Sequence, residues 1–234
     1  MSEWAVKRFW KSVSVEEVAN GFAVRLDAMA VMTPGKRVLA MPTREMAERV
    51  AAEWDAQADK VDPLSMPWTR SANTALDKIA TQRTEVEGHL IGYAGTDLLS
   101  YRAEDPEELA LRQSRAWDPL LDWVAQRFDV RLAVTRGIMP VAQRPDVLSR
   151  LSHEMTGMTD FQLTGFHDIV TLSGSFVLAL SVVHERAEAA EIWALSRIDE
   201  DWQIEQWGED EEAAEFANTR WRAVSHATEF YRLC

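Results

Sequence analysis

Hydrophobic positions alternate with polar ones over the N-terminal part of the chain. Between residues 5 and 42 the alternation is clearest at Val13 and Val15 and again from Phe22 to Leu26. A period of two is typical of a strand that buries one face. Asn20-Gly21 lies between the two alternating runs and favours a tight turn, so we predict a β-hairpin here.

A turn, a short strand and a helix are predicted to complete this region. Thr33–Lys36 contains a Pro-Gly turn signal, Val38–Met41 has the composition of a strand, and Pro42-Thr43 is suited to begin a helix. We predict that this helix extends to about Lys60. The apolar residues that share one of its faces are Met46, Val50 and Trp54.

Helix start signals replace the alternation after Asp62-Pro63. Asp105-Pro106-Glu107-Glu108 offers an N-cap, a proline at the first helical position and a capping-box glutamate. Asp118-Pro119 predicts that a helix restarts. Arg144-Pro145-Asp146 predicts another helix, after an extended segment over Val130–Thr135.

Three helices are predicted in the C-terminal third. Thr159-Asp160-Phe161-Gln162 is a capping box that opens an apolar helix reaching Val183. Ala187–Gln206 predicts one long helix, which Gly208 terminates. Asp210 is predicted to cap a final helix that runs nearly to the C-terminus.

These patterns predict an α+β protein with two parts. Residues 1–65 form a small β-rich N-terminal module with one helix, and residues 66–234 form a larger all-helical C-terminal domain. The boundary is placed near Val61–Pro67, where two prolines coincide with the change of pattern. With 234 residues and 47% hydrophobic content, the chain can bury a substantial core.

Charge narrows the range of partners. The formal net charge is −13 and the sequence pI is about 4.9. A nucleic acid or an anionic membrane surface would be repelled, because binding phosphates requires a basic surface. We therefore expect neither nucleic-acid binding nor membrane insertion. The longest apolar run, Ile169–Val183, is interrupted by small polar residues and is shorter than the roughly 20 residues of a membrane span.

Cysteine usage and the N-terminus suggest a compartment. Cys234 is the only cysteine, so no internal disulfide can form, which fits a reducing environment. The segment Met1–Arg8 shows neither an apolar signal core nor an Arg/Ser-rich transit peptide. We expect a cytoplasmic protein or an already processed chain.

Motifs for catalysis, metals and nucleotides are weak. Pro34–Arg37 lacks the loop of a nucleotide-binding P-loop, and Ser173-Gly174-Ser175 lies inside an apolar run rather than in a nucleophile elbow. His167-Asp168 is the one pair that could act as a general base, although a structural link to the N-terminal module is the favoured interpretation. The five histidines have no metal-ligand spacing. They are His89, His153, His167, His184 and His226.

Ten tryptophans accompany only three tyrosines. Packing between helices explains most such residues, whereas aromatic side chains rimmed by charge are typical of a binding surface. Ile192, Leu195, Ile198 and Trp202 are predicted to share a buried face. The tryptophans predicted on helices are Trp54, Trp117, Trp123, Trp193, Trp202 and Trp207.

The densest group of carboxylates surrounds residue 207. Such a run is either a solvated face that also complements the N-terminus of the last helix, or an electrostatic docking surface for a basic partner. The composition leaves both interpretations open. The acidic residues are Asp199, Glu200, Asp201, Glu205, Glu209, Asp210, Glu211, Glu212 and Glu215.

Three separated segments follow one further pattern. One is Thr33-Pro34-Gly35-Lys36 running into Ala52-Glu53-Trp54-Asp55-Ala56-Gln57. Another runs from Tyr101-Arg102 through Pro106 to Trp117-Asp118-Pro119. The last is the helix that ends in Trp207-Gly208 and is followed by an acidic restart. In this order they resemble the Atp12 family of chaperones for the α subunit of the F1 ATP synthase, and the resemblance extends over nearly the whole chain. Mitochondrial members of that family carry a targeting extension, so the resemblance implies a bacterial, cytoplasmic member or an already processed chain.

The resemblance implies a monomeric chaperone without catalytic activity, cofactor or metal. Its partner would be the unassembled F1 α subunit, whose β-facing surface it would cover until assembly. The residues implied to bind the partner are Glu205, Trp207, Gly208, Asp210, Glu211 and Glu212. Those implied to have a structural role are Trp54, Asp55, Trp117, Asp118 and Pro119.

Two alternatives remain open from the residues themselves. A small hydrolase or isomerase could use His167 with Asp168. An acidic interaction adaptor unrelated to ATP synthase would have a similar composition.

Overall fold

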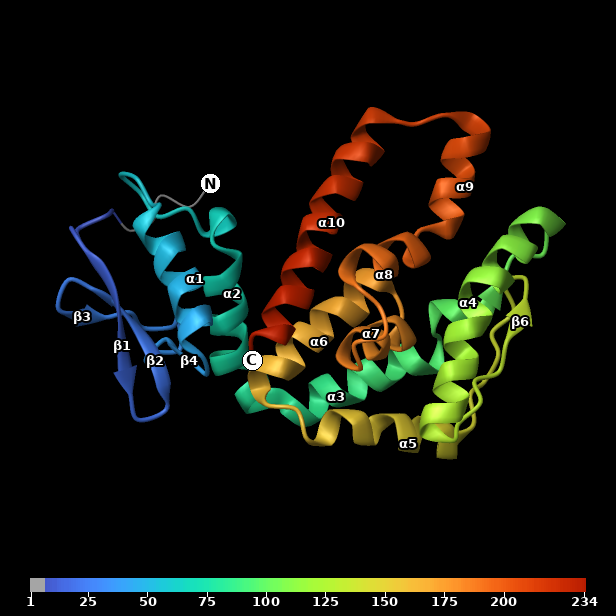
Figure 1. Ribbon diagram of the computed structural model, residues 1–234, viewed down its shortest axis with the longest axis horizontal. Helices are drawn as coiled ribbons and strands as arrows, with labels where there is room; N and C mark the ends of the chain where they lie inside the picture. The colour runs from blue at the N-terminus through green and yellow to red at the C-terminus, as the bar shows by residue number, and fades with distance from the viewer. Residues whose placement is uncertain (1–6) are drawn as a thin grey trace. The chain divides into compact units, whose positions relative to one another are not determined.

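The computed structural model describes residues 7–234, which fall into two compact units (Figure 1). The first unit comprises the chain up to Arg83 together with Thr159–Gly165 and Glu229–Cys234. The second comprises Thr84–Met158 and Phe166–Thr228. The first unit thus extends past residue 65. Most of the N-terminal segment that lacks signal-peptide features lies outside the described residues.

The first unit contains the predicted hairpin. Strands β1 (Val13–Val18) and β2 (Gly21–Leu26) are antiparallel, with Val15 opposite Val24. The short strands β3 (Met29–Ala30) and β4 (Ala40–Met41) also pair with β2. Gly21 has φ +126°, and a Cβ there would lie 2.1 Å from the carbonyl oxygen of Met41. Only glycine fits this position.

Helix α1 (Arg44–Asp55) begins at the Thr43 N-cap, as predicted, but it ends before Lys60. The reason is Gln57, whose buried side chain donates to the Glu53 carbonyl at 3.0 Å and accepts from the Asp62 backbone at 2.7 Å. These bonds stabilise a turn where the pattern predicted helix. If the helix continued, the Gln57 side chain could not reach the Asp62 N–H, and that backbone group would lose its hydrogen-bond partner.

The remaining helices of the first unit are short. They are the 3-10 turn η1 (Pro63–Ser65), α2 (Pro67–Asn73), the π-helical η2 (Thr74–Ile79) and the start of α3 (Ala80–Gly95). In Figure 1, α1 lies beside the sheet of β1, β2 and β4, and α2 lies on the other side of α1. Their apolar faces and the sheet enclose one core. Its fully buried members include Val24, Leu39, Met41, Met46, Ala47, Val50, Ala72 and Ala75.

The capping box at Thr159 is confirmed. The backbone N–H of Thr159 donates to the Gln162 side chain at 2.9 Å, and the N–H of Gln162 donates to Thr159 Oγ1 at 3.1 Å. Phe161, just inside this box, packs on Phe230 with ring centroids 6.1 Å apart. Segments near the end of the chain therefore complete the N-terminal core. Burial raises the pKa of the neighbouring Cys234 thiol to about 12, which keeps it unreactive.

The second unit is mostly helical. Its first elements are the rest of α3, η3 (Leu98–Ser100), β5 (Tyr101–Arg102), α4 (Glu107–Phe128), β6 (Thr135–Arg136) and α5 (Pro145–Thr156). They are followed by most of α6 (Asp160–Ser173), α7 (Phe176–Val183), α8 (Ala189–Ser196), α9 (Ile198–Trp207) and most of α10 (Glu211–Arg232), since the start of α6 and the end of α10 belong to the first unit. The parallel ribbon of β5 and β6 is an exception to the prediction of an all-helical domain.

Helix α4 departs from two predictions. It runs without interruption through Pro119, although Asp118-Pro119 predicted a restart. Trp117 and Leu120, both buried, hold this turn against the core and offset the hydrogen bond that proline cannot donate. The N-cap position is Pro106 rather than Asp105, without a side-chain cap bond.

The apolar helix predicted to reach Val183 is two helices. Gly174 separates α6 from α7 with φ +72°. The fully buried carboxylate of Asp97 accepts hydrogen bonds from Ser175 Oγ at 2.8 Å and from the Val177 backbone at 3.0 Å. Burial raises the pKa of Asp97 to about 6, although these bonds lower it. A side chain that is distant in sequence thus provides the start of α7.

The long helix predicted over Ala187–Gln206 is also divided. Arg197, with φ −116° and ψ 14°, separates α8 from α9. The predicted shared face is therefore incomplete. Ile192 and Ile198 are buried, whereas Leu195 and Trp202 are only partly buried.

The α+β class is confirmed, with a sheet in the N-terminal region and helices in most of the rest. None of the helices that the structure describes has both the length and the apolar character needed to cross a membrane.

Candidate functional site

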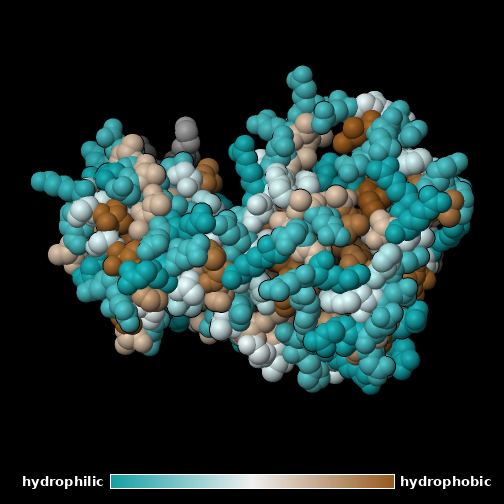
Figure 2. All heavy atoms as spheres, in the orientation of Figure 1, coloured by the Kyte–Doolittle hydropathy of each residue, from teal (hydrophilic) through white to brown (hydrophobic). Residues whose placement is uncertain are grey.

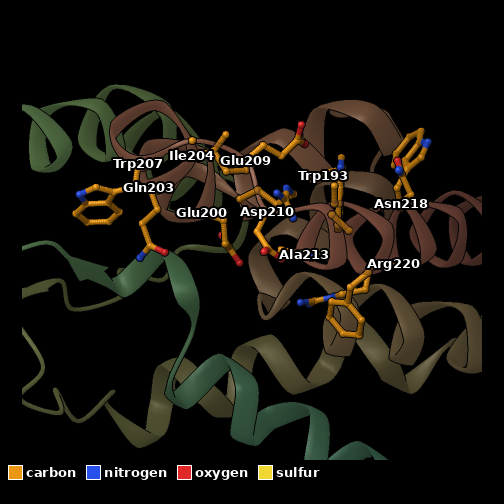
Figure 3. A pocket seen from close by; sticks show the side chains of 16 residues that line it. Trp193, Glu200, Gln203, Ile204, Trp207, Glu209, Asp210, Ala213, Asn218 and Arg220 are labelled. Carbon is orange, nitrogen blue, oxygen red and sulfur yellow. Dashed lines mark hydrogen bonds between the residues drawn. The ribbon is translucent and has the colours of Figure 1, made fainter.

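A groove of about 620 Å³ lies between α9 and α10 in the second unit (Figure 3). We call it the aromatic groove. One wall comes from α9, including Gln203, Ile204 and Trp207, and the other comes from α10. Its other aromatic and charged lining residues are Trp193, Arg197, Glu200, Glu209, Asp210, Phe216, Arg220 and Trp221.

A short extended link joins the two helices (Figure 1). Gly208 ends α9 with φ +89° and ψ 166°, and its N–H still donates to the Ile204 carbonyl at 2.8 Å. Asp210 then begins α10, accepting from the Ala213 backbone at 2.9 Å. Glycine tolerates this backbone conformation, and the aspartate caps the helix that follows. The predicted roles of Gly208 as terminator and Asp210 as cap are confirmed.

Two aromatic side chains in this groove are exposed to an unusual degree. Trp207 is 79% exposed and Phe216 is 64% exposed. Hydrophilic side chains cover most of the face shown in Figure 2. Large aromatic rings left in water lose the free energy that burial would provide, about 25 cal/mol for each Å². Such side chains, gathered in one groove, are typical of a surface that another molecule covers.

The base of the groove is better packed. Trp193 and Trp221 lie with ring centroids 6.2 Å apart. The guanidinium of Arg197 lies over Trp193 at 4.9 Å, and that of Arg220 over Phe216 at 5.9 Å. Arg220 also donates to the Leu172 carbonyl at 2.6 Å. The rings of Trp193 and Phe216 therefore each have an arginine partner within the chain, whereas Trp207 has none among the described residues.

The acidic residues around the groove differ in their contacts. Glu205 pairs with Arg112 of α4 at 2.8 Å, and Asp201 lies 3.4 Å from Arg197. Glu211 and Glu212, in the first turn of α10, are exposed to solvent. Surface ion pairs contribute little stability, typically about 0–1 kcal/mol. The acidic surface thus adds little to the fold and remains accessible to a partner.

The predicted structural residues near position 54 lie in the first unit. The ring of Trp54 packs edge-on against Trp10 at 5.4 Å. Arg8 donates to the Asp55 carbonyl at 2.7 Å and lies 3.3 Å from its carboxylate. Trp54 therefore packs within the core of its own unit.

Glu53, in the same segment, has a role that the sequence did not reveal. Its carboxylate accepts from the backbone N–H groups of Trp68 at 2.7 Å and Thr69 at 2.8 Å. It also accepts from Thr69 Oγ1 at 2.7 Å. The side chain therefore caps α2, while desolvation on burial raises its pKa. A cap supplied by a residue 15 positions away leaves no local signal.

The turn at Thr33–Lys36 is also stabilised by a carboxylate that is distant in sequence. The carboxylate of Asp77 accepts from Thr33 Oγ1 and from the backbone N–H of Gly35, both at 2.7 Å. A Cβ at Gly35 would lie 2.5 Å from Asp77 Oδ1. This part of the family-like pattern is therefore explained by the fold.

Arg102 and Trp117-Asp118 meet in the second unit. Arg102, only 5% exposed, donates to Asp118 at 2.7 Å and stacks over Trp117 at 4.9 Å. Trp117 Nε1 donates to the Leu195 carbonyl at 2.9 Å. Through these contacts, Trp117 and Asp118 join α4 to β5 and α8 and have a structural role.

The His167-Asp168 pair is formed, with Nδ1 3.0 Å from the carboxylate. Both residues lie on α6 within the second unit, and His89 lies beside the His167 ring at 6.1 Å. A pair of adjacent residues on one helix is not a catalytic arrangement without a third group aimed at it. Within residues 7–234, no group of three or more potential ligands could hold a metal ion.

Phe216 and Trp221 are aromatic residues of the groove that the sequence patterns did not single out. A signal for Phe216 was present, because it is a large apolar side chain among alanines and glutamates at the start of α10. Single exposed aromatics are common, however, so this signal alone could not separate it from chance.

Comparisons with known proteins agree on one family. The sequence profile of the ATP12 chaperone protein family matches residues 7–125. The mitochondrial protein atp12 of Schizosaccharomyces pombe is 25% identical over 225 residues, covering 91% of this chain and 77% of that protein.

Two solved structures are similar over nearly the whole chain. The crystal structure of Atp12 from Paracoccus denitrificans has a TM-score of 0.92 and 46% identity, covering 99% of both chains. A protein of Agrobacterium tumefaciens has a TM-score of 0.88 and 38% identity, covering 95% of this chain and 85% of its own. The fold of this chain is therefore shared with these relatives over nearly its whole length.

Proposed function

Since this chain belongs to the family of ATP12 chaperone proteins, we propose that it binds the unassembled α subunit of the F1 ATP synthase in the aromatic groove. The chaperone would cover the surface of α that later meets β. An unpaired subunit exposes apolar interface and aggregates, so a temporary cover lowers the concentration of the exposed state. We expect the protein to act as a monomer in the bacterial cytoplasm.

The observation that carries this proposal is the pair of exposed rings, Trp207 and Phe216, in a groove with an acidic rim. Aromatic anchors surrounded by charge are the residues that contribute most to protein interfaces. The acidic rim supports fast association with a basic surface and adds less to affinity. No nucleotide is needed for release, because β would compete for the same surface of α.

The test is co-expression of this chain with F1 α in the absence of β, followed by size-exclusion chromatography. We expect a soluble one-to-one complex that dissociates when purified β is added. Trp207→Ala and Phe216→Ala should each reduce the recovered complex. The matched control is Leu64→Ala, which removes another exposed apolar side chain, 81% exposed, from the first unit.

The proposal fails if α precipitates alone while the chain elutes by itself. It also fails if Leu64→Ala reduces the complex as strongly as the two groove variants, because the groove would then have no special role.

A further inference from the structure

A second groove, of about 610 Å³, lies on the other side of Trp207. It is bounded by β5, the start of α4, the residues after β6 and the face of α9 that carries Trp202. Trp207 lines both grooves. All of these residues belong to the second unit.

The aromatic rings of the second groove carry no cation of their own. Elsewhere in the unit arginines cover aromatic rings, as Arg197 covers Trp193 and Arg102 covers Trp117. Within the part of the chain that the structure describes, no such cation and no neighbouring ring covers Tyr101, Trp202 or Trp207. Their faces are available to a cation from another molecule.

The charges lining this groove favour a cation. Three carboxylates line it, those of Glu104, Asp105 and Asp199. Asp199 accepts a hydrogen bond from Gln113 at 2.5 Å and Asp105 interacts electrostatically with Arg136, whereas Glu104 has no ion pair among residues 7–234. Among the lining residues that the structure describes, the one cation is Arg102, whose charge is already paired with Asp118 at 2.7 Å. The lining therefore has a net negative charge, which disfavours an anionic ligand and favours a lysine or arginine beside the aromatic rings.

The edge of the second groove is apolar and unusually exposed. Ile138 is 95% exposed, and its neighbour Met139 is 73% exposed. Ile138 is also a lining residue of the groove. An occupant that carries a cation flanked by apolar side chains would satisfy both the edge and the carboxylates.

We propose that the second groove binds a lysine or arginine side chain of the F1 α subunit, with apolar neighbours of that residue resting on Ile138. This inference rests on the proposed function and extends it, because it assigns a separate site for a cationic side chain. In this arrangement Trp207 contacts the partner on both faces, and the second groove selects the register of the bound segment.

The first test compares two charge reversals in the full chain, with affinity for purified F1 α measured by biolayer interferometry. Glu104→Lys changes the second groove, and Glu104 forms no ion pair within residues 7–234. Glu48→Lys, at an exposed position of α1, makes the same change in net charge outside both grooves. We expect Glu104→Lys to weaken binding by at least about tenfold and Glu48→Lys to change it by less than about twofold.

The outcomes separate the two proposals. If α binds and Trp207→Ala weakens it, but Glu104→Lys behaves like Glu48→Lys, the second groove is not a cation site and the proposed function stands. If the unmodified chain does not bind α, both proposals fail. Self-association that is lost in Glu104→Lys would show instead that the occupant is a second copy of this chain.

A second test identifies the occupant directly. Benzoylphenylalanine placed at position 138 should cross-link to a segment of α that has a lysine or arginine within about three residues, the reach of neighbouring side chains on an extended segment. Replacing that basic residue by glutamate should restore binding to Glu104→Lys. Cross-linking to a segment without a basic residue, or failure of the charge swap to restore binding, would overturn the proposal.

Discussion

Two segments that match the family pattern differ in whether their side chains have partners within their own unit. In Ala52–Gln57, the side chains of Glu53, Trp54 and Gln57 are bonded or packed inside the first unit. In the other segment, from Glu205 to Glu212, Trp207 and its acidic neighbours are exposed.

The difference shows how a shared sequence pattern divides into roles. Where each residue of a pattern has a partner within its own unit, stability explains the pattern. Where a large aromatic ring stays exposed although it could be replaced by a polar residue at no cost to the core, stability does not explain it. The second segment is therefore the better candidate for contact with another protein.

The largest expected effect comes from making one substitution in both segments. Trp54→Arg places a charge against the Trp10 ring in the first core, and we expect it to lower the free energy of unfolding by about 4 kcal/mol or to prevent folding. Trp207→Arg should leave that free energy within about 0.5 kcal/mol of the original and should reduce capture of α. Urea unfolding followed by circular dichroism measures the first quantity. Equal stability of the two variants would remove the distinction between the segments.

Asp97 is fully buried in the second unit, so its protonation changes the free energy of unfolding of the unit that carries the grooves. Its pKa is raised to about 6 from 3.8, so the folded chain holds a proton that the unfolded chain releases between these values. The stabilisation from that proton is complete below pH 3.8 and is lost as the pH rises through 6. Relative to Asp97→Asn, the unmodified protein should lose about 2 kcal/mol between pH 4 and 7.

Unfolding curves of both proteins across this range measure the difference. If the unmodified protein instead gains stability relative to Asp97→Asn as the pH rises, the hydrogen bonds from Ser175 and Val177 outweigh the effect of burial.

Glu53 tests whether the first of these segments contributes to stability. Glu53→Gln removes one of the two acceptor oxygens that cap α2, and we expect it to cost about 1–2 kcal/mol. Glu48→Gln is the matched control, because Glu48 is exposed on the same helix. Thermal unfolding of the two variants at neutral pH decides the matter, and equal midpoints would mean that the cap contributes nothing.

The smallest expected effect concerns Asp210, which combines a cap with a negative charge. Asp210→Ala removes the acceptor for the Ala213 N–H and should cost about 1 kcal/mol, seen as faster amide exchange in the first turn of α10. Asp210→Asn keeps an acceptor and should leave exchange nearly unchanged. If Asp210→Asn nevertheless weakens capture of α, its charge contributes to binding. If capture falls only in Asp210→Ala, the position of the helix is what matters.

Local signals predicted much of the fold. The hairpin, the N-cap of α1, the Thr159 capping box, the α5 start, the end of α9 at Gly208 and the Asp210 cap were all readable, because each depends on residues within a few positions of one another. The errors share a cause. The breaks at Gly174 and Arg197 and the continuity of α4 through Pro119 depend on contacts with distant residues, and period and capping cannot report these.

The candidate site was predictable only in part. Trp207 and the acidic residues were found from the density of carboxylates and from the family resemblance. Tyr101, Arg102 and Pro106 also belong to the family pattern, but nothing in the sequence indicated that they line a groove with α9, and Phe216 lies outside the pattern. Tyr101 and Glu104 are far from Trp202 in sequence, and they line one groove with it only because β5 and α9 come together in the second unit.

The sequence by itself determined the α+β class, the main capping residues and the acidic character of the surface, because these follow from local periodicity, local hydrogen bonding and composition. Only the tertiary structure decided which tryptophans are buried and which stay exposed, since burial depends on the elements that happen to pack nearby. The same reason explains why the chemistry of the second groove could not be read from the order of its residues.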